Sequence, residues 1–425
     1  MSRTAPRPRT VSWRRLLGPG LITGASDDDP SGIATYSQVG AQFGFGLLWT
    51  MLFTFPLMAA TQEISARIGR VTGRGLASNL REFAPAPLLY GVTALLVGAN
   101  VINLGADLGA MGAALRLLIG GHAHLYTALL ALLSVALLVF VPYSRYVRWL
   151  RWLTLALFTY VATVFVVRVP WSEALRATLL PHLSWNAASL QALVAVLGTT
   201  ISPYLFFWQA SQEVEDSRAE PGETRLRHRP DLAPAQFRRI RLDTLVGMGF
   251  SNLVAYFIIL TAAVTLHASG QTHIATAAQA AQALRPVAGR LAFALFALGI
   301  VGTGLLAVPV LTGSAAFAVG EALRWPVGLA RRPLEARGFY LVLGASALLG
   351  VGLNFTPVDP IRALVLAAVV NGVASAPVMA AMLLLASSRR VMGEFVLPPG
   401  LKVLGWIAAL VMLTASVLML ATLGR

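Results

Sequence analysis

The 425-residue sequence contains no cysteine, and charged residues make up only 12% of it. The missing cysteine excludes disulfides, thiolate metal ligands and thiol redox chemistry. A soluble domain carries roughly 25% charged residues, whereas hydrophobic residues reach 56% of this chain. Apolar runs of about 18 residues or more recur along the sequence, and each is long enough to cross the hydrocarbon of a bilayer. The composition therefore predicts a polytopic α-helical membrane protein.

The distribution of basic residues predicts how the chain crosses the membrane. Most of the 33 Lys and Arg residues fall in the N-terminal tail, residues 1–16, or in loops on its side of the expected spans. Loops rich in Lys and Arg stay in the cytoplasm. We therefore expect a multi-pass protein of a bacterial-type plasma (inner) membrane, with its N-terminus inside and its C-terminus outside. The same asymmetry accounts for the net charge of +15 without nucleic acid as a partner. The eleven expected spans lie near residues 17–42, 46–66, 86–115, 124–142, 149–167, 188–211, 242–266, 290–320, 338–354, 360–387 and 403–423.

Acidic residues are scarce, yet three of them stand together inside the first span. Asp27, Asp28 and Asp29 precede Pro30 in the stretch SDDDPSG. An aspartate at the centre of a membrane helix costs about 2.5–3.5 kcal/mol on insertion scales, so these carboxylates need water, a proton, an opposite charge or a bound cation. We interpret Asp29 as a cation ligand, with Asp27 and Asp28 lining the approach. Capping of a helix at the break is the alternative role for Asp29.

A second interruption lies five spans later. The sixth span contains GTTISPYLFFWQ, with Pro203 in its middle. Proline removes an amide donor and frees an upstream carbonyl, and unwound backbone is tolerated in a membrane only where it is buried in protein or lines a cavity. Interrupted spans at corresponding positions of two halves are typical of inverted-repeat transporters, which bind substrate near the midplane between the breaks. For a lone proline such as Pro309, in the eighth span, a kink is the default interpretation.

Several motifs resemble those of a known family. The triplet Gly18-Pro19-Gly20 precedes Asp29-Pro30-Ser31-Gly32, the second span reads LLWTMLFTFPLMAATQEISARIGRVTGRGLA, and the tenth span ends in MLLLASSRRVMGEF. In these segments the chain resembles the Nramp divalent metal transporters, whose first helix is unwound at a DPGN motif. The resemblance covers nearly the whole chain and implies an all-α LeuT-type fold. It implies one inverted five-helix repeat at 17–167 with a break at 26–32, a second at 188–387 with a break at 199–204 and a cytoplasmic loop at 212–241, and an eleventh span at 403–425.

The sixth span departs from the family pattern where that pattern contacts metal. The family has A-x-x-M-P-H, whereas this chain has Ser202 in place of the Met and Tyr204 in place of the His. A second family His aligns with Gln209, and the Asn of DPGN aligns with Gly32. Ser26 and Thr199 align with positions that offer backbone carbonyls. For Ser202, simple packing is the alternative, and Tyr204 also suits a gate. The resemblance thus implies metal-contacting positions at Asp29, Ser202, Ser26, Thr199, Gly32 and Tyr204.

A further set of positions is expected along the pathway of the ion or of protons: Asp28, Asp27, Asp107, Gln209 and Asn371. Asp107 matches an Asp of the family's proton route in the third span, but Ala110 replaces the Glu that follows it there. All six histidines fall in loops or at span ends, so none is left within the spans to titrate near neutrality. We therefore expect weak or absent proton coupling. A hydrogen-bonded structural role between helices is the alternative for Asp107.

The loss of the methionine sulfur predicts a site that tolerates harder ions. Thioethers favour softer ions, whereas carboxylate, hydroxyl and carbonyl oxygens suit Mg²⁺, Ca²⁺ and Mn²⁺, and Mg²⁺ keeps several of its waters. We expect uptake of a divalent metal ion, Mg²⁺ or Mn²⁺, by alternating access, with the metal as substrate and no cofactor. A proton-coupled Mn²⁺/Fe²⁺ symporter and a LeuT-type carrier of a small organic solute are the alternatives.

Motifs of enzymatic chemistry are missing from the sequence. It contains no phosphate-binding glycine-rich loop, no nucleophile elbow and no zinc-protease helix, and we therefore expect no enzyme. The expected partners are the metal ion and the lipid bilayer, for a chain that acts as a single copy.

Overall fold

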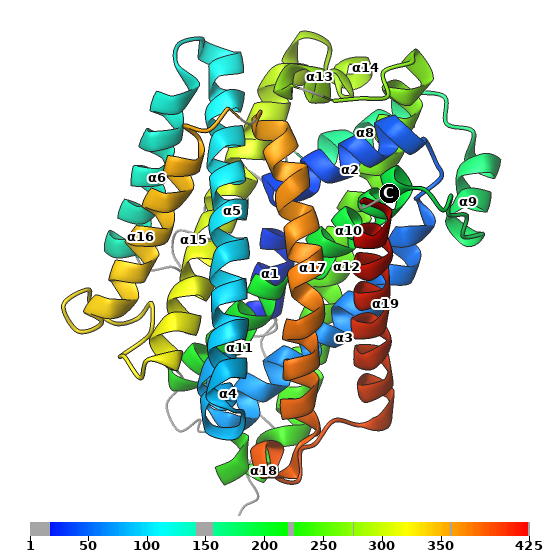
Figure 1. The fold of residues 1–425 in the computed structure, drawn as a ribbon. Coiled ribbons are helices and arrows are strands. Elements are labelled where there is room, and N and C mark those ends of the chain that lie inside the picture. Colours follow the sequence, from blue (N-terminus) through cyan, green and yellow to red (C-terminus); the bar gives the residue numbers. More distant parts are fainter. Residues whose placement is uncertain are drawn as a thin grey trace, which may run out of the picture.

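Every element in the described part of the chain is helical. The computed structural model describes residues 18–141, 155, 157–219, 225–274, 276–357 and 359–423, so the expected tail and the first part of the fifth span lie outside it. The helices form one bundle, with α6 and α16 on one flank and α19 on the other (Figure 1). The principal helices are α1 (Pro19–Asp27), α2 (Pro30–Phe43), α3 (Trp49–Thr72), α4 (Leu76–Phe83), α5 (Ala86–Ile119), α6 (Ala123–Phe140), α8 (Phe158–Val166), α9 (Trp171–Leu179), α10 (Ala187–Thr200), α11 (Pro203–Ala219), α12 (Ala233–Thr265), α13 (Ala277–Gln282), α14 (Arg285–Ala288), α15 (Ala292–Ala322), α16 (Arg337–Leu353), α17 (Pro360–Ser387), α18 (Arg389–Met392) and α19 (Pro399–Leu423).

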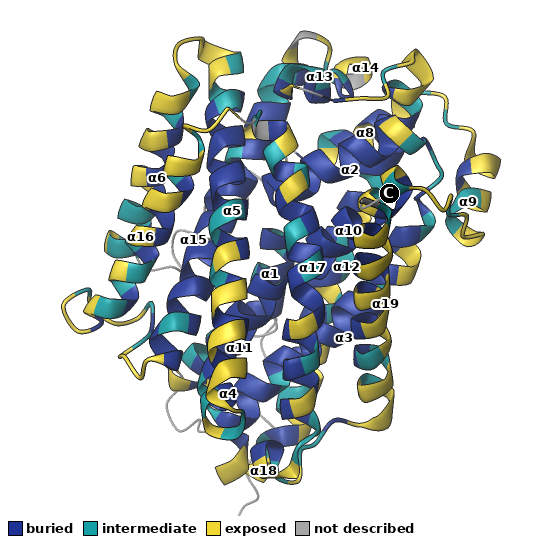
Figure 2. Ribbon diagram, in the orientation of Figure 1, coloured by how far each residue is buried: buried dark blue, intermediate teal, exposed yellow. Residues whose placement is uncertain are grey.

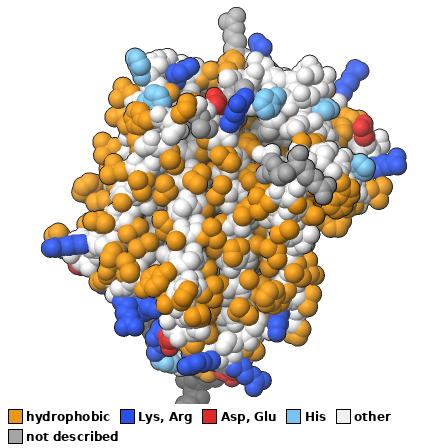
Figure 3. Space-filling model, viewed as in Figure 1, with side chains coloured by type: hydrophobic (Ala, Val, Ile, Leu, Met, Phe, Trp, Pro, Cys, Tyr) orange, Lys and Arg blue, Asp and Glu red, His pale blue; other side chains and the backbone are white. Residues whose placement is uncertain are grey.

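The outer surface has the pattern of a protein embedded in lipid. Among the described residues, seven helical stretches are long and apolar enough to cross a membrane. The other expected spans correspond to the short pair α1 and α2, the more polar α3, the nine-residue α8 and the 17-residue α16. Leu132 on α6, Leu348 on α16 and Leu410 on α19 are 66%, 75% and 57% exposed. Hydrophobic side chains cover the middle of the face in Figure 3, and most Lys and Arg side chains lie towards its two ends. The chain is therefore a multi-pass membrane protein.

The interior of the bundle holds the interrupted spans. Figure 2 shows α1, α2 and α10 largely buried, whereas α6, α16 and α19 turn exposed faces outward. Tyr36 on α2 and Leu205 on α11 are completely buried. The breaks in these spans therefore lie away from lipid, where unpaired backbone groups are tolerated.

The first break follows directly from its proline and its aspartate. α1 ends at Asp27 and α2 begins at Pro30, whose missing N–H is harmless in the first turn of a helix. Asp29 is the N-cap of α2, and its Oδ1 accepts the backbone N–H of Gly32 at 2.7 Å. The hydroxyl of Ser31 donates to the same oxygen at 2.8 Å. The predicted alternative, helix capping by Asp29, is thus present in the structure.

The second break has a similar layout. α10 ends at Thr200 and α11 begins at Pro203, with Ile201 and Ser202 between them. The hydroxyl of Ser375, on α17, donates to the Ile201 carbonyl at 2.6 Å and holds one of the freed carbonyls. Each break is therefore a short, fixed segment with identifiable partners.

Glycines let the interrupted helices lie close to their neighbours. A methyl group added at Gly24 of α1 would overlap the Gly247 backbone of α12, and one added at Gly198 of α10 would overlap the Ala368 carbonyl of α17. Gly40 of α2 makes the same kind of approach to α12. Small residues permit such backbone contact between membrane helices. Both broken spans are consequently seated against unbroken helices.

Candidate functional site

Asp29 lies where the two breaks meet. Its Oδ1 is occupied by the cap of α2, and its Oδ2 accepts hydrogen bonds from Asn103 Nδ2 at 3.0 Å and from the Tyr204 hydroxyl at 3.2 Å. Asn103 belongs to α5 and Tyr204 to α11, so three separate spans converge on one carboxylate. The residue is 1% exposed. Burying a charge in this way is costly unless it is paired, and its four neighbours here are neutral donors.

The other two aspartates of the cluster face a different helix. Ser251 Oγ, on α12, lies 2.7 Å from Asp27 Oδ2 and 3.1 Å from Asp28 Oδ1. Both aspartates are buried, and Asp27 Oδ1 has no hydrogen-bond partner. The three carboxylates therefore divide into a pair at α12 and a single group, Asp29, between α5 and α11.

Gly32 and Thr199 bring the two breaks into contact. A methyl group added at Gly32 would lie 3.1 Å from Thr199 Oγ1 and 3.4 Å from the Asp27 carbonyl. Thr199 Oγ1 is buried and makes no well-formed hydrogen bond. Glycine at this position thus lets the two breaks lie close together, between the Thr199 hydroxyl, the Tyr36 ring and the Asp27 carbonyl. Hydroxyl and carbonyl oxygens are ligands that hard cations accept.

The two serines beside the breaks bond within their own helices. The Ser202 hydroxyl lies 2.7 Å from the Gly198 carbonyl and 3.1 Å from the Thr199 carbonyl. The Ser26 hydroxyl donates to the Ile22 carbonyl at 2.9 Å. Both side chains therefore use their hydrogen locally, and each hydroxyl oxygen keeps lone pairs that can accept or ligate.

Three further positions predicted along the pathway are buried polar groups. Neither carboxylate oxygen of Asp107 makes a well-formed hydrogen bond, although the residue lies close enough to Asp29 and to the Ser31 amide to interact with both electrostatically. Asn371 on α17 has neither side-chain atom paired. Gln209 on α11 contacts the hydroxyl of Thr23 through its carbonyl oxygen, and its amide nitrogen is unpaired.

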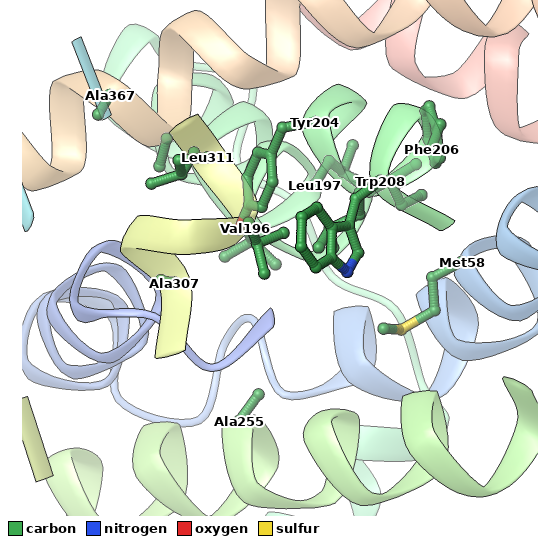
Figure 4. Close-up of a cluster of buried hydrophobic side chains, with 14 of the residues drawn as sticks. Met58, Val196, Leu197, Tyr204, Phe206, Trp208, Ala255, Ala307, Leu311 and Ala367 are labelled. Carbon is green, nitrogen blue, oxygen red and sulfur yellow. The ribbon is translucent and has the colours of Figure 1, made fainter. Parts of the chain in front are cut away.

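An apolar shell surrounds the second break. Figure 4 shows Tyr204 near Val196, Leu197 and Leu311, with Trp208 beside it on the same helix. These side chains are all buried. Buried apolar side chains lower the local dielectric, and a low dielectric strengthens every charge interaction made there.

A cavity of about 370 Å³ reaches towards the breaks from one end of the bundle. It lies between α2, α10 and the first turns of α17, and its lining includes Thr35 and Ala195. Thr35 is four residues beyond Ser31 on α2, and Ala195 is four residues before Thr199 on α10. Fewer than two helical turns therefore separate these lining residues from the break on each helix.

The arrangement suits a cation with few protein charges around it. Within the described ranges, no group of three or more His, Cys, Asp or Glu side chains is placed to hold a metal ion. Where the two breaks meet, the Asp29 carboxylate lies among amide, hydroxyl and carbonyl oxygens, and Asp107 lies within its electrostatic range. Such a donor set is typical of sites for hard ions that retain some water.

Asn103 and Ser251 contact the aspartates of the first break but were not predicted from the sequence. Asn103 stands four residues before Asp107 in the stretch NLGADLGAMG, so both side chains lie on the same face of α5. That spacing was a usable signal. Ser251 carries no comparable signal, because a serine in a membrane helix usually bonds its own backbone.

Comparisons with known proteins agree over nearly the full length. The family model described as "Natural resistance-associated macrophage protein-like" (Nramp) matches residues 20–422. "Divalent metal cation transporter MntH" of Aeromonas hydrophila is 27% identical over 390 residues, which are 89% of each chain. The Eremococcus coleocola manganese transporter has a similar structure, with a TM-score of 0.74 at 18% identity over 98% of this chain and 88% of the other. MhsT, solved with L-phenylalanine, has a TM-score of 0.62 at 12% identity over 99% and 100%. These structural likenesses confirm the predicted all-α LeuT-type fold.

Proposed function

The chain belongs to the Nramp family, and from this premise we propose that it carries divalent metal ions inward across a bacterial-type plasma membrane. The family is one of transporters, which confirms that the chain is not an enzyme. The metal ion is a substrate and not a resident cofactor. The observation that carries the proposal is the meeting of two interrupted membrane helices at one buried carboxylate, Asp29.

The proposed site uses Asp29 for charge and the two breaks for neutral oxygens. Asn103 and Tyr204 donate hydrogen bonds to one oxygen of Asp29, and a bound dication would replace these hydrogen bonds by a stronger charge interaction. The carbonyls of Ser26 and Thr199, the hydroxyl of Ser202 and the space at Gly32 complete the proposed set. Asp27, Asp28, Gln209 and Asn371 are assigned to the approach on either side.

One carboxylate facing a dication leaves a net positive charge on the loaded site. Moving one elementary charge through a membrane potential changes its free energy by about 2.3 kcal/mol per 100 mV. A negative-inside potential therefore favours inward movement of the loaded site. This drive needs no proton gradient, and it supports a transporter with weak or absent proton coupling.

The proposed selectivity includes hard ions. Ser202 replaces a sulfur ligand by oxygen, and oxygen sites accept Mg²⁺ as well as Mn²⁺. A serine side chain is also smaller than methionine, which leaves room for the waters that Mg²⁺ retains. We therefore assign Mg²⁺ or Mn²⁺ as the cargo, with a site that discriminates weakly between them.

Alternating access is supported by the asymmetry of the two ends. The cavity near Thr35 and Ala195 approaches the breaks from the end that we assign to the outside. At the other end, the carboxylate of Asp243 on α12 accepts the backbone N–H groups of Gly18, Gly20 and Leu21 and fixes the start of α1. We propose that release of α1 from α12 opens the inner side, with the N-terminus in the cytoplasm and one copy sufficient for transport.

Proton-coupled symport is the second candidate, and Asp107 is the observation in its favour. This buried carboxylate lacks a well-formed hydrogen bond and lies in the electrostatic range of Asp29. A proton on Asp107 would relieve that repulsion, and binding of a dication at Asp29 would displace it. Metal-driven acidification of the vesicle lumen at a clamped membrane potential distinguishes this candidate from uncoupled uptake.

Uptake by purified protein in proteoliposomes tests the proposed function. Mn²⁺ and Mg²⁺ are measured separately for the native chain and for Asp29→Ala, with Asp231→Asn as a control, because Asp231 is exposed at the surface. We expect both ions to enter through the native and control proteins and neither through Asp29→Ala. Entry of Mn²⁺ alone would contradict the selectivity proposed from Ser202. Entry of neither ion through the native protein would contradict metal transport and direct the search to organic solutes.

A further inference from the structure

A groove on the lipid-facing side of the bundle is independent of the transport site. It has a volume of about 380 Å³ and lies between α3, α12 and the start of α19. Its walls are mainly apolar, and its charged lining residues are Glu63, Arg67 and Arg241. The apolar wall consists of Phe55, Pro56, Ala59, Leu245, Leu401 and Leu404, with Ala60 at its side.

The groove opens onto surface that hydrocarbon covers. Four exposed hydrophobic side chains adjoin the lining of the groove: Leu52, Phe53, Val246 and Val403. The first two precede its α3 wall, the third follows Leu245 on α12, and the last lies between Leu401 and Leu404 on α19. In Figure 1 the start of α19 lies at the end of the bundle that carries α18, the end assigned to the cytoplasm. The groove thus begins at the cytoplasmic edge of the membrane and runs towards its interior.

Charge is concentrated at the mouth of the groove. Arg67 is already balanced, because its guanidinium pairs with Glu63 at 2.6 Å and packs over the Phe237 ring at 4.4 Å. Arg241 is exposed, and within the described ranges no hydrogen bond or ion pair engages its side chain. Arg238 precedes Arg241 by three residues on α12 and is also exposed, so both lie on one face of that helix. The mouth therefore carries uncompensated positive charge.

We propose that this groove binds an anionic phospholipid of the cytoplasmic leaflet. One acyl chain lies along the apolar wall, and the phosphate lies at Arg241 and Arg238. Arginine binds phosphate through its planar fork of donors. Basic pockets between membrane helices on the cytoplasmic side suit anionic headgroups, and apolar walls of this kind exclude a soluble anion as the preferred occupant.

Native mass spectrometry of the full chain in detergent tests this proposal. The protein is titrated with phosphatidylglycerol and, separately, with phosphatidylcholine of the same acyl chains. We expect phosphatidylglycerol to bind at a lower lipid concentration than phosphatidylcholine. This preference should fall about fivefold for each of Arg241→Gln and Arg238→Gln, because each arginine near an anionic headgroup contributes about 1 kcal/mol. Arg332→Gln, an exposed arginine on the loop before α16, is the matched control and leaves the preference unchanged.

A second variant tests the acyl part of the site. Leu404→Trp fills the groove without altering its charge, and we expect it to weaken binding of both lipids; unchanged size-exclusion profiles exclude misfolding of each variant. Equal binding of the two lipids by the native protein, or an unchanged preference in Arg241→Gln, would overturn the proposal. Glycerol 3-phosphate has the phosphate but no acyl chains. If it competed for the groove as strongly as phosphatidylglycerol does, the proposal would also be overturned, and the groove would be a site for soluble phosphate.

Discussion

The attachment of α1 to α12 allows a prediction in free-energy terms. Asp243 Oδ1 accepts the N–H groups of Gly18 at 3.0 Å and Leu21 at 3.1 Å, and Oδ2 accepts that of Gly20 at 2.7 Å. Asn at this position has one oxygen, so Asp243→Asn leaves at least one N–H facing a donor. A hydrogen bond to a charged group contributes about 1.5–3 kcal/mol. We therefore expect the ratio of released to attached α1 to rise roughly 10- to 150-fold.

The absence of cysteine makes this shift measurable. Ser26→Cys introduces the chain's one thiol, and Ser26 is fully buried on α1 close to the first break. A membrane-impermeant maleimide applied to the cytoplasmic side labels this thiol only when α1 leaves α12. We expect Asp243→Asn to increase the labelling rate by up to the same factor. We also expect Mg²⁺ or Mn²⁺ to change the labelling rate, both with Asp243 and with Asp243→Asn.

A matched control replaces a carboxylate that does not contact α1. Asp231→Asn alters an exposed carboxylate that pairs with Arg229 at 2.9 Å, so the labelling rate should stay unchanged. If Asp243→Asn labels no faster than this control, the carboxylate does not hold α1 closed. Faster labelling from the external side alone would show that the end of the bundle assigned to the cytoplasm faces the outside.

Three other predictions concern single side chains. Asn103→Ala removes a 3.0 Å hydrogen bond to the carboxylate of Asp29. Because the ion then no longer displaces this bond, Mn²⁺ affinity measured by isothermal titration should rise about tenfold; an unchanged affinity would show that the bond does not compete with the ion. Gly24→Ala forces the α1 and α12 backbones apart and should lower the free energy of unfolding by about 1–3 kcal/mol, measured as a lower thermal midpoint. Gly344→Ala is the control, because its added methyl group meets open space, and it should leave the midpoint unchanged. Gln38→Ala removes two hydrogen bonds from α2 to the loop that follows α12 and should speed amide hydrogen exchange in that loop; unchanged exchange would show that other contacts hold it.

The fold was largely predictable because its signals are local. The length of each apolar run predicts the spans, and a proline beside polar residues predicts each break. In the structure, Asp28 and Asp29 separate α1 from α2, and Ile201 and Ser202 separate α10 from α11. These signals depend on the chemistry of a few adjacent residues. The resemblance to the family then predicted the arrangement of the helices, which no local signal determines.

The site was only partly predictable, because its partners come from distant spans. Asp29 is conspicuous as a charge in an apolar span, but Asn103 lies 74 residues away and meets it only through helix packing. Ser251 meets Asp27 across 224 residues. Ser202 lies at the predicted break, yet its hydroxyl bonds to the end of α10. Side-chain direction depends on helix rotation and on competing backbone acceptors, and neither can be read from spacing alone.

Asp29 is proposed to supply the charge that binds a divalent cation where the two broken helices meet. Equilibrium binding of Mn²⁺ to purified native protein and to Asp29→Asn tests it most directly, because asparagine keeps the shape of the side chain and removes its charge. Breaking a buried charge pair costs about 3–5 kcal/mol, so we expect Asp29→Asn to weaken binding by more than about 100-fold and Asp231→Asn to bind like the native protein. Equal affinities for the native protein and Asp29→Asn would show that Asp29 does not bind the ion, and would leave the pair Asp27 and Asp28, beside Ser251, as the remaining carboxylates of the break.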